Sequence, residues 1–158
     1  MTFAKFVLSY GGFGLAPKAP GTFGTVGPAL TAAAFLAWAP DVASHWQGLC
    51  LAWIGLASLL TVLLTPLVEA ETGLKDPGAI VMDEVAGYWA TLLFIPHPGP
   101  THLVAAFFIF RFFDVVKVWP GHRLEHLASG WGVLLDDVSA GIYGGLVLWA
   151  LDRWTSLG

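Results

Sequence analysis

A run of 20 residues without a charged side chain, from Leu49 to Val68, places the strongest constraint on the fold of this chain. A helix of that length crosses a hydrocarbon layer of about 30 Å. The rest of the chain has the same character: 56% of its 158 residues are hydrophobic and only 11% are charged, whereas soluble domains carry about 25% charged residues. Too few polar side chains remain to cover a surface in water. The sequence therefore predicts an integral membrane protein.

Four further apolar segments complete the predicted fold, an all-α, polytopic bundle of about five membrane helices, some short or broken, in a single domain over residues 1–158. These segments are residues 26–39, 80–95, 101–118 and 132–151. A Gly/Pro-rich N-terminal loop precedes the first of them, because its prolines would break a longer helix. With Thr22 or Thr25 as N-cap, this tract is suited to holding an anion at a helix N-terminus. A connecting loop or a close-packing element is the alternative.

The Lys and Arg residues indicate an orientation. Nearly all of them fall on one side of the five-helix arrangement, and the loops at residues 40–48 and 96–101 on the other side contain none. Arg153 is the exception. The positive-inside rule then places the N-terminus at the cytoplasmic face. Four tryptophans near predicted helix ends are expected at the membrane interfaces: Trp38, Trp46, Trp53 and Trp149.

Three charged clusters lie on that same predicted face. Asp83-Glu84 and Asp136-Asp137 each sit near the start of an apolar segment, and the third cluster comprises Arg111, Asp114 and Lys117. The members of the third cluster are spaced i, i+3, i+6, so a helix puts them on one broad face. Charges beside apolar segments are unfavourable unless they pair with each other or with a ligand. We expect the three clusters to converge on one site; ion pairs that anchor separate helix ends are the alternative.

The residue types in these clusters indicate a chemistry. Five neighbouring carboxylates repel one another unless cations separate them, and a set of hard oxygen ligands favours Mg²⁺ over Zn²⁺. Arg and Lys beside such an ion form a phosphate site. The clusters therefore point to metal-assisted phosphoryl transfer or hydrolysis at the membrane surface. The chain has no basic patch, so a nucleic-acid partner is not expected.

Four sequence blocks, GFGLAPKAPGTFGT, IVMDEVAG, FRFFDVVKVWP and GVLLDDVSAG, occur in this order between residues 12 and 141. The ordered set resembles the phosphatidylglycerophosphatase A family of bacterial inner-membrane lipid phosphatases. This resemblance implies Mg²⁺-dependent hydrolysis of the terminal phosphomonoester of phosphatidylglycerophosphate, the last step of phosphatidylglycerol synthesis, at the cytoplasmic leaflet. The implied partners are the phospholipid substrate and the bilayer; the sequence does not fix an oligomeric state.

The resemblance also implies roles for single residues. The metal ligands would be Asp83, Glu84, Asp136 and Asp137. Asp114 would be a further ligand or orient water, and with Asp83 and Asp137 it completes the catalytic set. Phosphate would be bound by Arg111 and Lys117, with help from Lys18 and Thr22. Attack by water is the preferred mechanism, and a covalent phosphate on Asp114 remains open.

Two other classes of function use the same charges. A small membrane transporter or cation-binding protein would need carboxylates deep in several helices, and a non-enzymatic membrane subunit would use the charges only to dock a partner. The stretches 51–64 and 142–151 are uncharged, and the carboxylates gather at one predicted face. This distribution favours the phosphatase.

Overall fold

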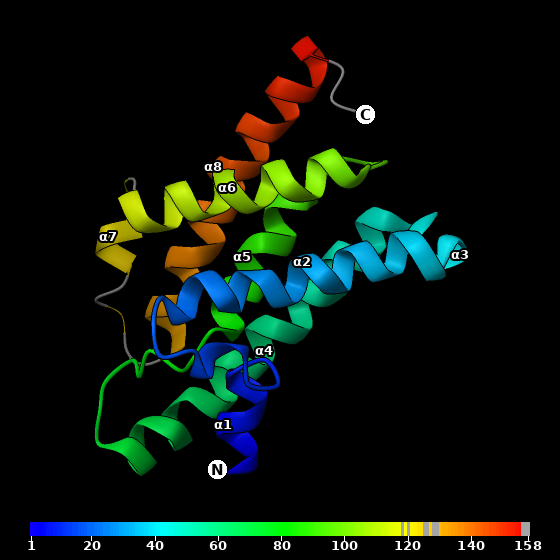
Figure 1. Cartoon of the computed structure of the whole chain (residues 1–158). Helices are drawn as coiled ribbons and strands as arrows, with labels where there is room; N and C mark the ends of the chain where they lie inside the picture. Colours follow the sequence, from blue (N-terminus) through cyan, green and yellow to red (C-terminus); the bar gives the residue numbers. More distant parts are fainter. Residues whose placement is uncertain (118, 120, 125–126, 128–129, 156–158) are drawn as a thin grey trace.

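The computed structural model describes residues 1–117, 119, 121–124, 127 and 130–155, and every regular element in these ranges is a helix (Figure 1). In chain order the elements are α1 (Phe3–Leu8), the short 3₁₀ helix η1 (Phe13–Leu15), α2 (Pro20–Trp38), α3 (Pro40–Ala43), α4 (Trp46–Thr72), α5 (Met82–Leu92), α6 (Pro100–Val116), α7 (Gly121–Leu124) and α8 (Gly130–Thr155). The all-α prediction is confirmed, and the five predicted helices correspond to α2, α4, α5, α6 and α8.

Proline and glycine set several helix ends. Pro20 occupies the first turn of α2, where its missing N–H is no loss. Gly73 ends α4 in the left-handed conformation, and its N–H donates to the Glu69 carbonyl oxygen at 2.8 Å. The prediction of Thr22 or Thr25 as N-cap was wrong, because α2 begins before both of them at Pro20, and Ala19 is its N-cap residue.

Helix α1 lies before the Gly/Pro-rich tract, in a segment for which the sequence predicted no element. Its first turn is capped by the Thr2 hydroxyl, which accepts a hydrogen bond from the Lys5 N–H at 3.4 Å. Leu8 at its end is fully buried, and the Leu8 carbonyl accepts from the Val81 N–H at 2.9 Å. The N-terminal segment is thereby joined to the residue directly before α5.

Helix α5 is the centre of the molecule and packs against α2, α4, α6 and α8 (Figure 1). Every residue in it except Glu84 is buried. With 11 residues it extends only about 17 Å, so it cannot cross a hydrocarbon layer alone. The segment predicted as a membrane helix over residues 80–95 is therefore a short core helix.

Aromatic rings fill the core beside α5. Trp89 stacks on Trp53 with ring centroids 5.7 Å apart and contacts Trp46 at 5.5 Å. The expected interfacial position was therefore wrong for Trp46, which is 1% exposed, and Trp53 is only partly exposed. Trp38 and Trp149 do lie on the surface. Large buried rings contribute strongly to stability because each removes a large apolar area from water.

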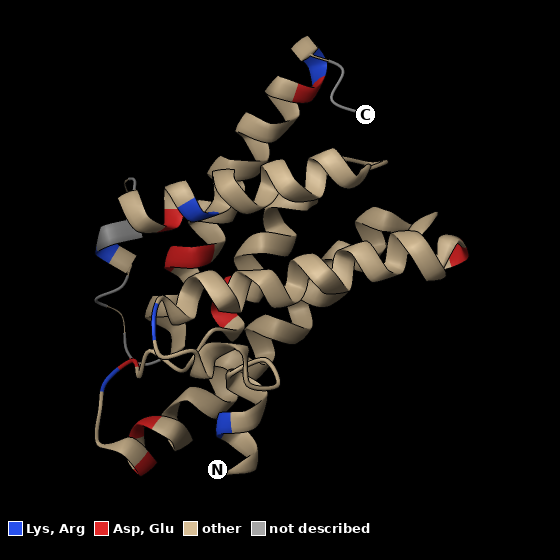
Figure 2. Ribbon diagram, viewed as in Figure 1, with Lys and Arg blue, Asp and Glu red and all other residues tan. Residues whose placement is uncertain are grey.

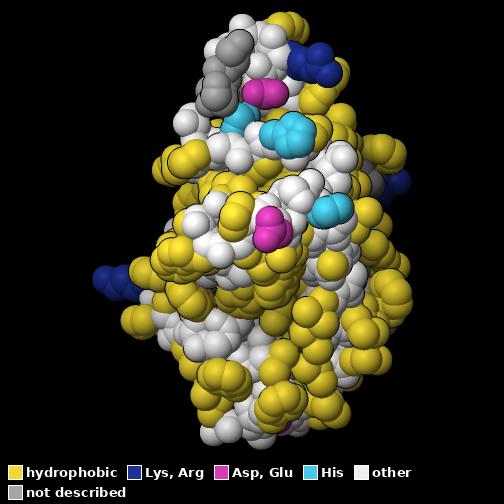
Figure 3. Space-filling view, turned by 90° about the vertical axis from the view of Figure 1, so that its right-hand side faces the viewer, with side chains coloured by type: hydrophobic (Ala, Val, Ile, Leu, Met, Phe, Trp, Pro, Cys, Tyr) yellow, Lys and Arg dark blue, Asp and Glu magenta, His cyan; other side chains and the backbone are white. Residues whose placement is uncertain are grey.

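Two helices among the described residues, α4 and α8, are long and apolar enough to cross a membrane. Their most apolar stretches have mean hydropathies of 2.1 and 1.4. One side of α4 exposes large apolar side chains, namely Leu51, Leu56, Leu59, Leu63 and Leu67. Hydrophobic side chains also dominate the face seen in Figure 3. A surface of this kind suits a lipid environment better than water, and we take the two long helices to indicate membrane association.

Candidate active site

The three charged clusters meet around one cavity of about 390 Å³, where the starts of α2 and α5 approach the end of α6 and the second turn of α8. Figure 2 shows the charged segments gathered in this region, while the opposite halves of α2 and α6 carry none. Six carboxyl groups and two cationic side chains line the cavity: Asp76, Asp83, Glu84, Arg111, Asp114, Lys117, Asp136 and Asp137. The convergence expected from the sequence is thus present in the structure.

Two glycines bring the aspartates of α5 and α8 together. A Cβ atom on Gly141 would overlap the Gly87 carbonyl oxygen, and one on Gly87 would lie 2.6 Å from the Asp137 carbonyl oxygen. The two backbones therefore touch directly, which only glycine permits. Asp83 and Asp137 each lie four residues, about one turn, before the glycine of their own helix. The crossing thus sets both carboxylates, each 6% exposed, on one cavity wall.

Glu84 packs against the first turns of α2. A Cβ atom on Gly24 would lie 2.6 Å from Glu84 Oε2, and one on Gly21 would overlap Glu84 Oε1. The Thr25 hydroxyl lies 3.3 Å from Glu84 Oε2, within hydrogen-bond distance. The glycines of the N-terminal tract therefore form a helix face that admits the Glu84 carboxylate, which matches the close-packing alternative considered for this tract.

The two cations join the clusters to one another. The Arg111 guanidinium lies 3.4 Å from Glu84 Oε1 and also contacts the Asp114 carboxylate, three residues later on α6. Lys117 Nζ lies 3.0 Å from Asp136 Oδ2. These ion pairs link α5 to α6 and α6 to α8, so both cations are held at the cavity wall by carboxylates from other helices.

Negative charge still exceeds positive charge in the cavity. The carboxyl groups of Asp114 and Asp137 are in hydrogen-bond contact, which requires a shared proton or a nearby cation. Asp83 Oδ1 is buried and has no hydrogen-bond partner among the described residues. An unsatisfied buried carboxylate oxygen among hard oxygen donors is what a divalent cation such as Mg²⁺ would satisfy. Within the described residues, however, no three candidate ligands are grouped closely enough to hold an ion as they are placed.

The positive end of α2 also faces the cavity. Ala19, Pro20 and Gly21, at the start of this helix of 19 residues, form part of the lining. The N-terminus of a helix attracts anions through its free N–H groups and its dipole. Lys18 is exposed and Thr22 is partly exposed, and the structure places both beside the cavity lining rather than in it. Their roles in phosphate binding remain predictions.

Asp76 is a lining residue that the sequence did not single out. It lies in the link between α4 and α5 and has a positive φ of 50°. Its side chain reaches solvent, yet the surrounding protein desolvates it enough to raise its pKa, and the nearby Lys117 ammonium opposes that effect. The usable signal was the sequence Asp-Pro-Gly, which predicts a turn immediately before the Asp83-Glu84 block.

The chain is similar in sequence to known proteins. Residues 6–152 match the family described as Phosphatidylglycerophosphatase A. The Phosphatidylglycerophosphatase A of Haemophilus influenzae is 34% identical over 144 residues, covering 90% of this chain and 85% of the relative. That of Escherichia coli is 32% identical, covering 93% of this chain and 82% of the relative.

A third relative has a different name. The Putative phosphatidylinositol-3-phosphatase of Bacteroides thetaiotaomicron is 34% identical, with coverages of 90% and 89%. No solved structure matches the chain. The family match covers most of the sequence, and two relatives above 30% identity carry the family's name. The chain therefore belongs to the phosphatidylglycerophosphatase A family and is an enzyme, a phosphomonoesterase.

Proposed function

We propose that this enzyme hydrolyses the terminal phosphomonoester of phosphatidylglycerophosphate to phosphatidylglycerol and inorganic phosphate. It would act with Mg²⁺ as a single multi-pass domain of the bacterial inner membrane, with its cavity at the cytoplasmic face. The observation that carries the proposal is the meeting of three charged clusters, from α5, α6 and α8, around one cavity in a member of this family.

Phosphate recognition falls to the cationic groups of the cavity. Arg111 offers a planar fork of donors that matches two phosphate oxygens, and Lys117 adds a point charge. Both are held in place by carboxylates, at 3.4 Å from Glu84 and 3.0 Å from Asp136. The N-terminus of α2 adds a third positive element. Fixed donors of this kind stabilise charge that develops on the phosphoryl oxygens during transfer.

The carboxylates supply the metal site. Asp83, Glu84, Asp136 and Asp137 would hold Mg²⁺, in keeping with the hard oxygen donors and with the unpartnered Asp83 Oδ1. When bound there, the ion would offset the excess negative charge, polarise a phosphoryl oxygen and make an attacking water more acidic.

Asp114 is placed to orient the attacking group. It pairs with Arg111 and contacts the Asp137 carboxyl, so its own carboxylate is fixed at the cavity wall. A water molecule that donates a hydrogen bond to the Asp114 carboxylate would pass a proton to it and attack phosphorus as the bond from phosphorus to the glycerol oxygen breaks. The leaving oxygen takes up a proton and departs as the alcohol. Attack by the Asp114 carboxylate itself, through an acyl phosphate, is the alternative.

A phosphoinositide monoester is a second candidate substrate. The relative named Putative phosphatidylinositol-3-phosphatase is as similar to this chain as the Haemophilus influenzae relative is. Overall identity therefore does not determine which headgroup is accepted. Phosphatidic acid, another lipid phosphomonoester, is a candidate minor substrate.

The direct test is phosphate release by the purified protein in detergent micelles, with Mg²⁺ and with a chelator. Phosphatidylglycerophosphate, phosphatidylinositol 3-phosphate and phosphatidic acid should be compared at equal mole fractions. We expect release that requires Mg²⁺, is fastest with phosphatidylglycerophosphate and is lost in Asp137→Asn. Asp41→Asn is the matched control, because Asp41 lies on α3 and is exposed. Absence of release from the folded wild type would contradict the proposal and favour a cation-binding or transport function.

A further inference from the structure

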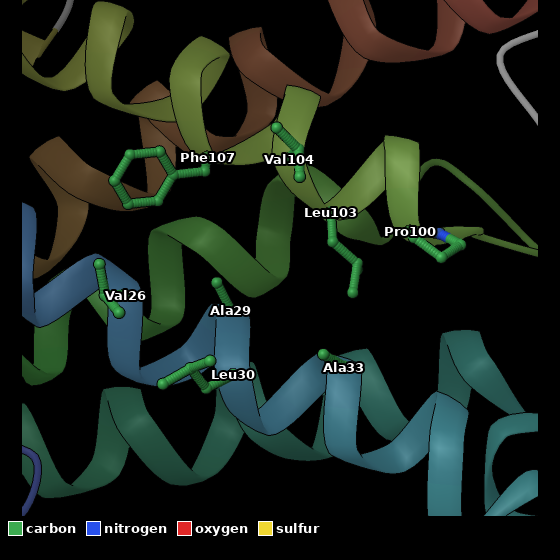
Figure 4. A pocket seen from close by; sticks show the side chains of 8 residues that line it. All are labelled: Val26, Ala29, Leu30, Ala33, Pro100, Leu103, Val104 and Phe107. Carbon is green, nitrogen blue, oxygen red and sulfur yellow. The ribbon is translucent and has the colours of Figure 1, made fainter.

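A second cavity, the α2–α6 groove, lies between α2 and α6 and has a volume of about 380 Å³ (Figure 4). Its lining consists of apolar side chains, among them Val26, Leu30, Ala33, Pro100, Val104 and Phe107. Leu30 and Val104 are each 58% exposed, so the groove is open along its length. Aqueous solvent would be a poor occupant of such a surface.

The groove is built from the same two helices as the charged cavity. α2 and α6 lie side by side in opposite directions (Figure 1), so the start of α2 and the end of α6 meet at the charged cavity. From there, Val26 lies five residues beyond Gly21 on α2, and Phe107 lies four residues before Arg111 on α6. At 1.5 Å per residue, the groove begins about 6–8 Å from the charged cavity along both helices.

We propose that the α2–α6 groove holds an acyl chain of the lipid whose phosphate occupies the charged cavity, an inference that rests on the proposed function. A lipid phosphomonoester joins an anionic headgroup to an acyl chain in one molecule, and the two cavities offer the matching surfaces in the matching order. From Val26 to Ala33 the groove follows α2 for about 10 Å. It provides a binding surface for the chain portion nearest the headgroup.

Filling the far end of the groove gives a kinetic test. Ala33→Phe puts a ring at the end distant from the charged cavity, and Ala52→Phe is the control on the exposed side of α4. Dipalmitoyl and dihexanoyl phosphatidylglycerophosphate are compared by kcat/KM, because a six-carbon chain ends short of Ala33. We expect Ala33→Phe to lower the long-chain to short-chain ratio about tenfold, the equivalent of about two methylene groups removed from the groove. An unchanged ratio, or an equal fall in Ala52→Phe, would overturn the proposal.

A labelling experiment gives a readout independent of turnover. Ala33→Cys introduces a thiol in the groove, and the native Cys50 is fully buried. We expect dipalmitoyl phosphatidylglycerophosphate to slow maleimide labelling of Ala33→Cys more than dipalmitoyl phosphatidylcholine does, with no difference at Ala52→Cys. Equal protection by both lipids would identify a site for bulk lipid, and protection by raised protein concentration a site for a second copy. Either result would overturn the proposal.

The kinetic test and the labelling test distinguish a failure of the proposed function from a failure of the groove proposal. If the wild type hydrolyses neither substrate, the proposed function fails, and selective protection of Ala33→Cys would still support the groove. If both substrates are hydrolysed but Ala33→Phe does not discriminate between them, the function stands and the groove proposal fails.

Discussion

Helix α6 carries a polar region near each end, and the two regions differ in how their groups are satisfied. Near its start, His102 is 1% exposed, its Nδ1 accepts from the Gly99 N–H at 3.0 Å, and its Nε2 lies 2.9 Å from Asp152 Oδ1. Both ring nitrogens therefore have partners. Near the end of α6, six carboxyl groups face two cationic side chains, and Asp83 Oδ1 has no hydrogen-bond partner in the part of the chain that the structure describes. The first pattern is typical of a structural contact, and the second of a ligand site.

The largest effect should come from Asp83→Asn at the charged cavity. The change removes the charge of a buried carboxylate whose Oδ1 has no hydrogen-bond partner among the described residues, so we expect phosphate release to fall by about 10²–10⁴-fold while the thermal midpoint stays level or rises. Parallel assays of phosphate release and thermal unfolding in the same detergent check this. Full activity in Asp83→Asn would contradict the functional role of the charged cavity, because both polar regions of α6 would then be structural.

A backbone change should damage both properties at once. In Gly141→Ala the added Cβ would overlap the Gly87 carbonyl oxygen, so α5 and α8 must separate. We expect a stability loss of about 1–3 kcal/mol together with reduced phosphate release, because Asp83 and Asp137 lie one turn from this contact. Gly55→Ala is the control, since a Cβ there meets no atom of another described element within 4 Å. Equal thermal midpoints for Gly141→Ala and Gly55→Ala would contradict the direct backbone contact between α5 and α8.

Asp152→Asn applies the same chemical change near the start of α6, where both ring nitrogens of His102 have partners. Asn still accepts a hydrogen bond from His102, but the charge that strengthens it is lost, so we expect a stability loss of about 0.5–1.5 kcal/mol. Phosphate release per folded molecule should be unchanged. Asp152→Asn should thus lose stability and keep activity, whereas Asp83→Asn should lose activity and keep stability. A selective loss of kcat at unchanged thermal midpoint would give the far end a functional role.

The smallest effect is expected from Asp76→Asn, at the solvent-exposed edge of the charged cavity. Because the pKa of Asp76 is raised, the folded protein binds this proton more tightly than the unfolded chain does. The resulting penalty is absent below the ordinary value of 3.8 and is complete once pH passes the raised value. The variant should therefore melt about 1 °C higher than wild type at neutral pH, and the gain should vanish in acid. Thermal scans between pH 3 and pH 7 measure this, and a gain in melting temperature that grows toward low pH would contradict the expected direction.

Much of the charged cavity could be predicted from the sequence because its residues stand out against apolar surroundings. Asp83-Glu84 and Asp136-Asp137 are conspicuous near the starts of apolar segments, and Arg111 and Asp114 share a helix face. The contact between Gly87 and Gly141, which brings these groups together, depends on helix packing across more than 50 residues. No local pattern in the sequence pairs Gly87 with Gly141.

The missed features have physical reasons of the same kind. Trp46 looked interfacial by its position near a helix end, but tertiary packing buries it against Trp89. Thr22 and Thr25 have the chemistry of N-caps, but Pro20 starts α2 earlier. In each case local propensity was overridden by packing or by a stronger neighbouring signal.

The shortness of α5 has a consequence for how the chain is assembled in a bilayer. A segment of 11 residues is too short to be inserted as a span by itself during synthesis. Its burial depends on α4, made before it, and on α8, made after it. Asp83 and Glu84 therefore reach their final positions only after α8 has been made and has docked on α5. A nascent chain that stops before α8 would lack Asp136 and Asp137 and would be inactive.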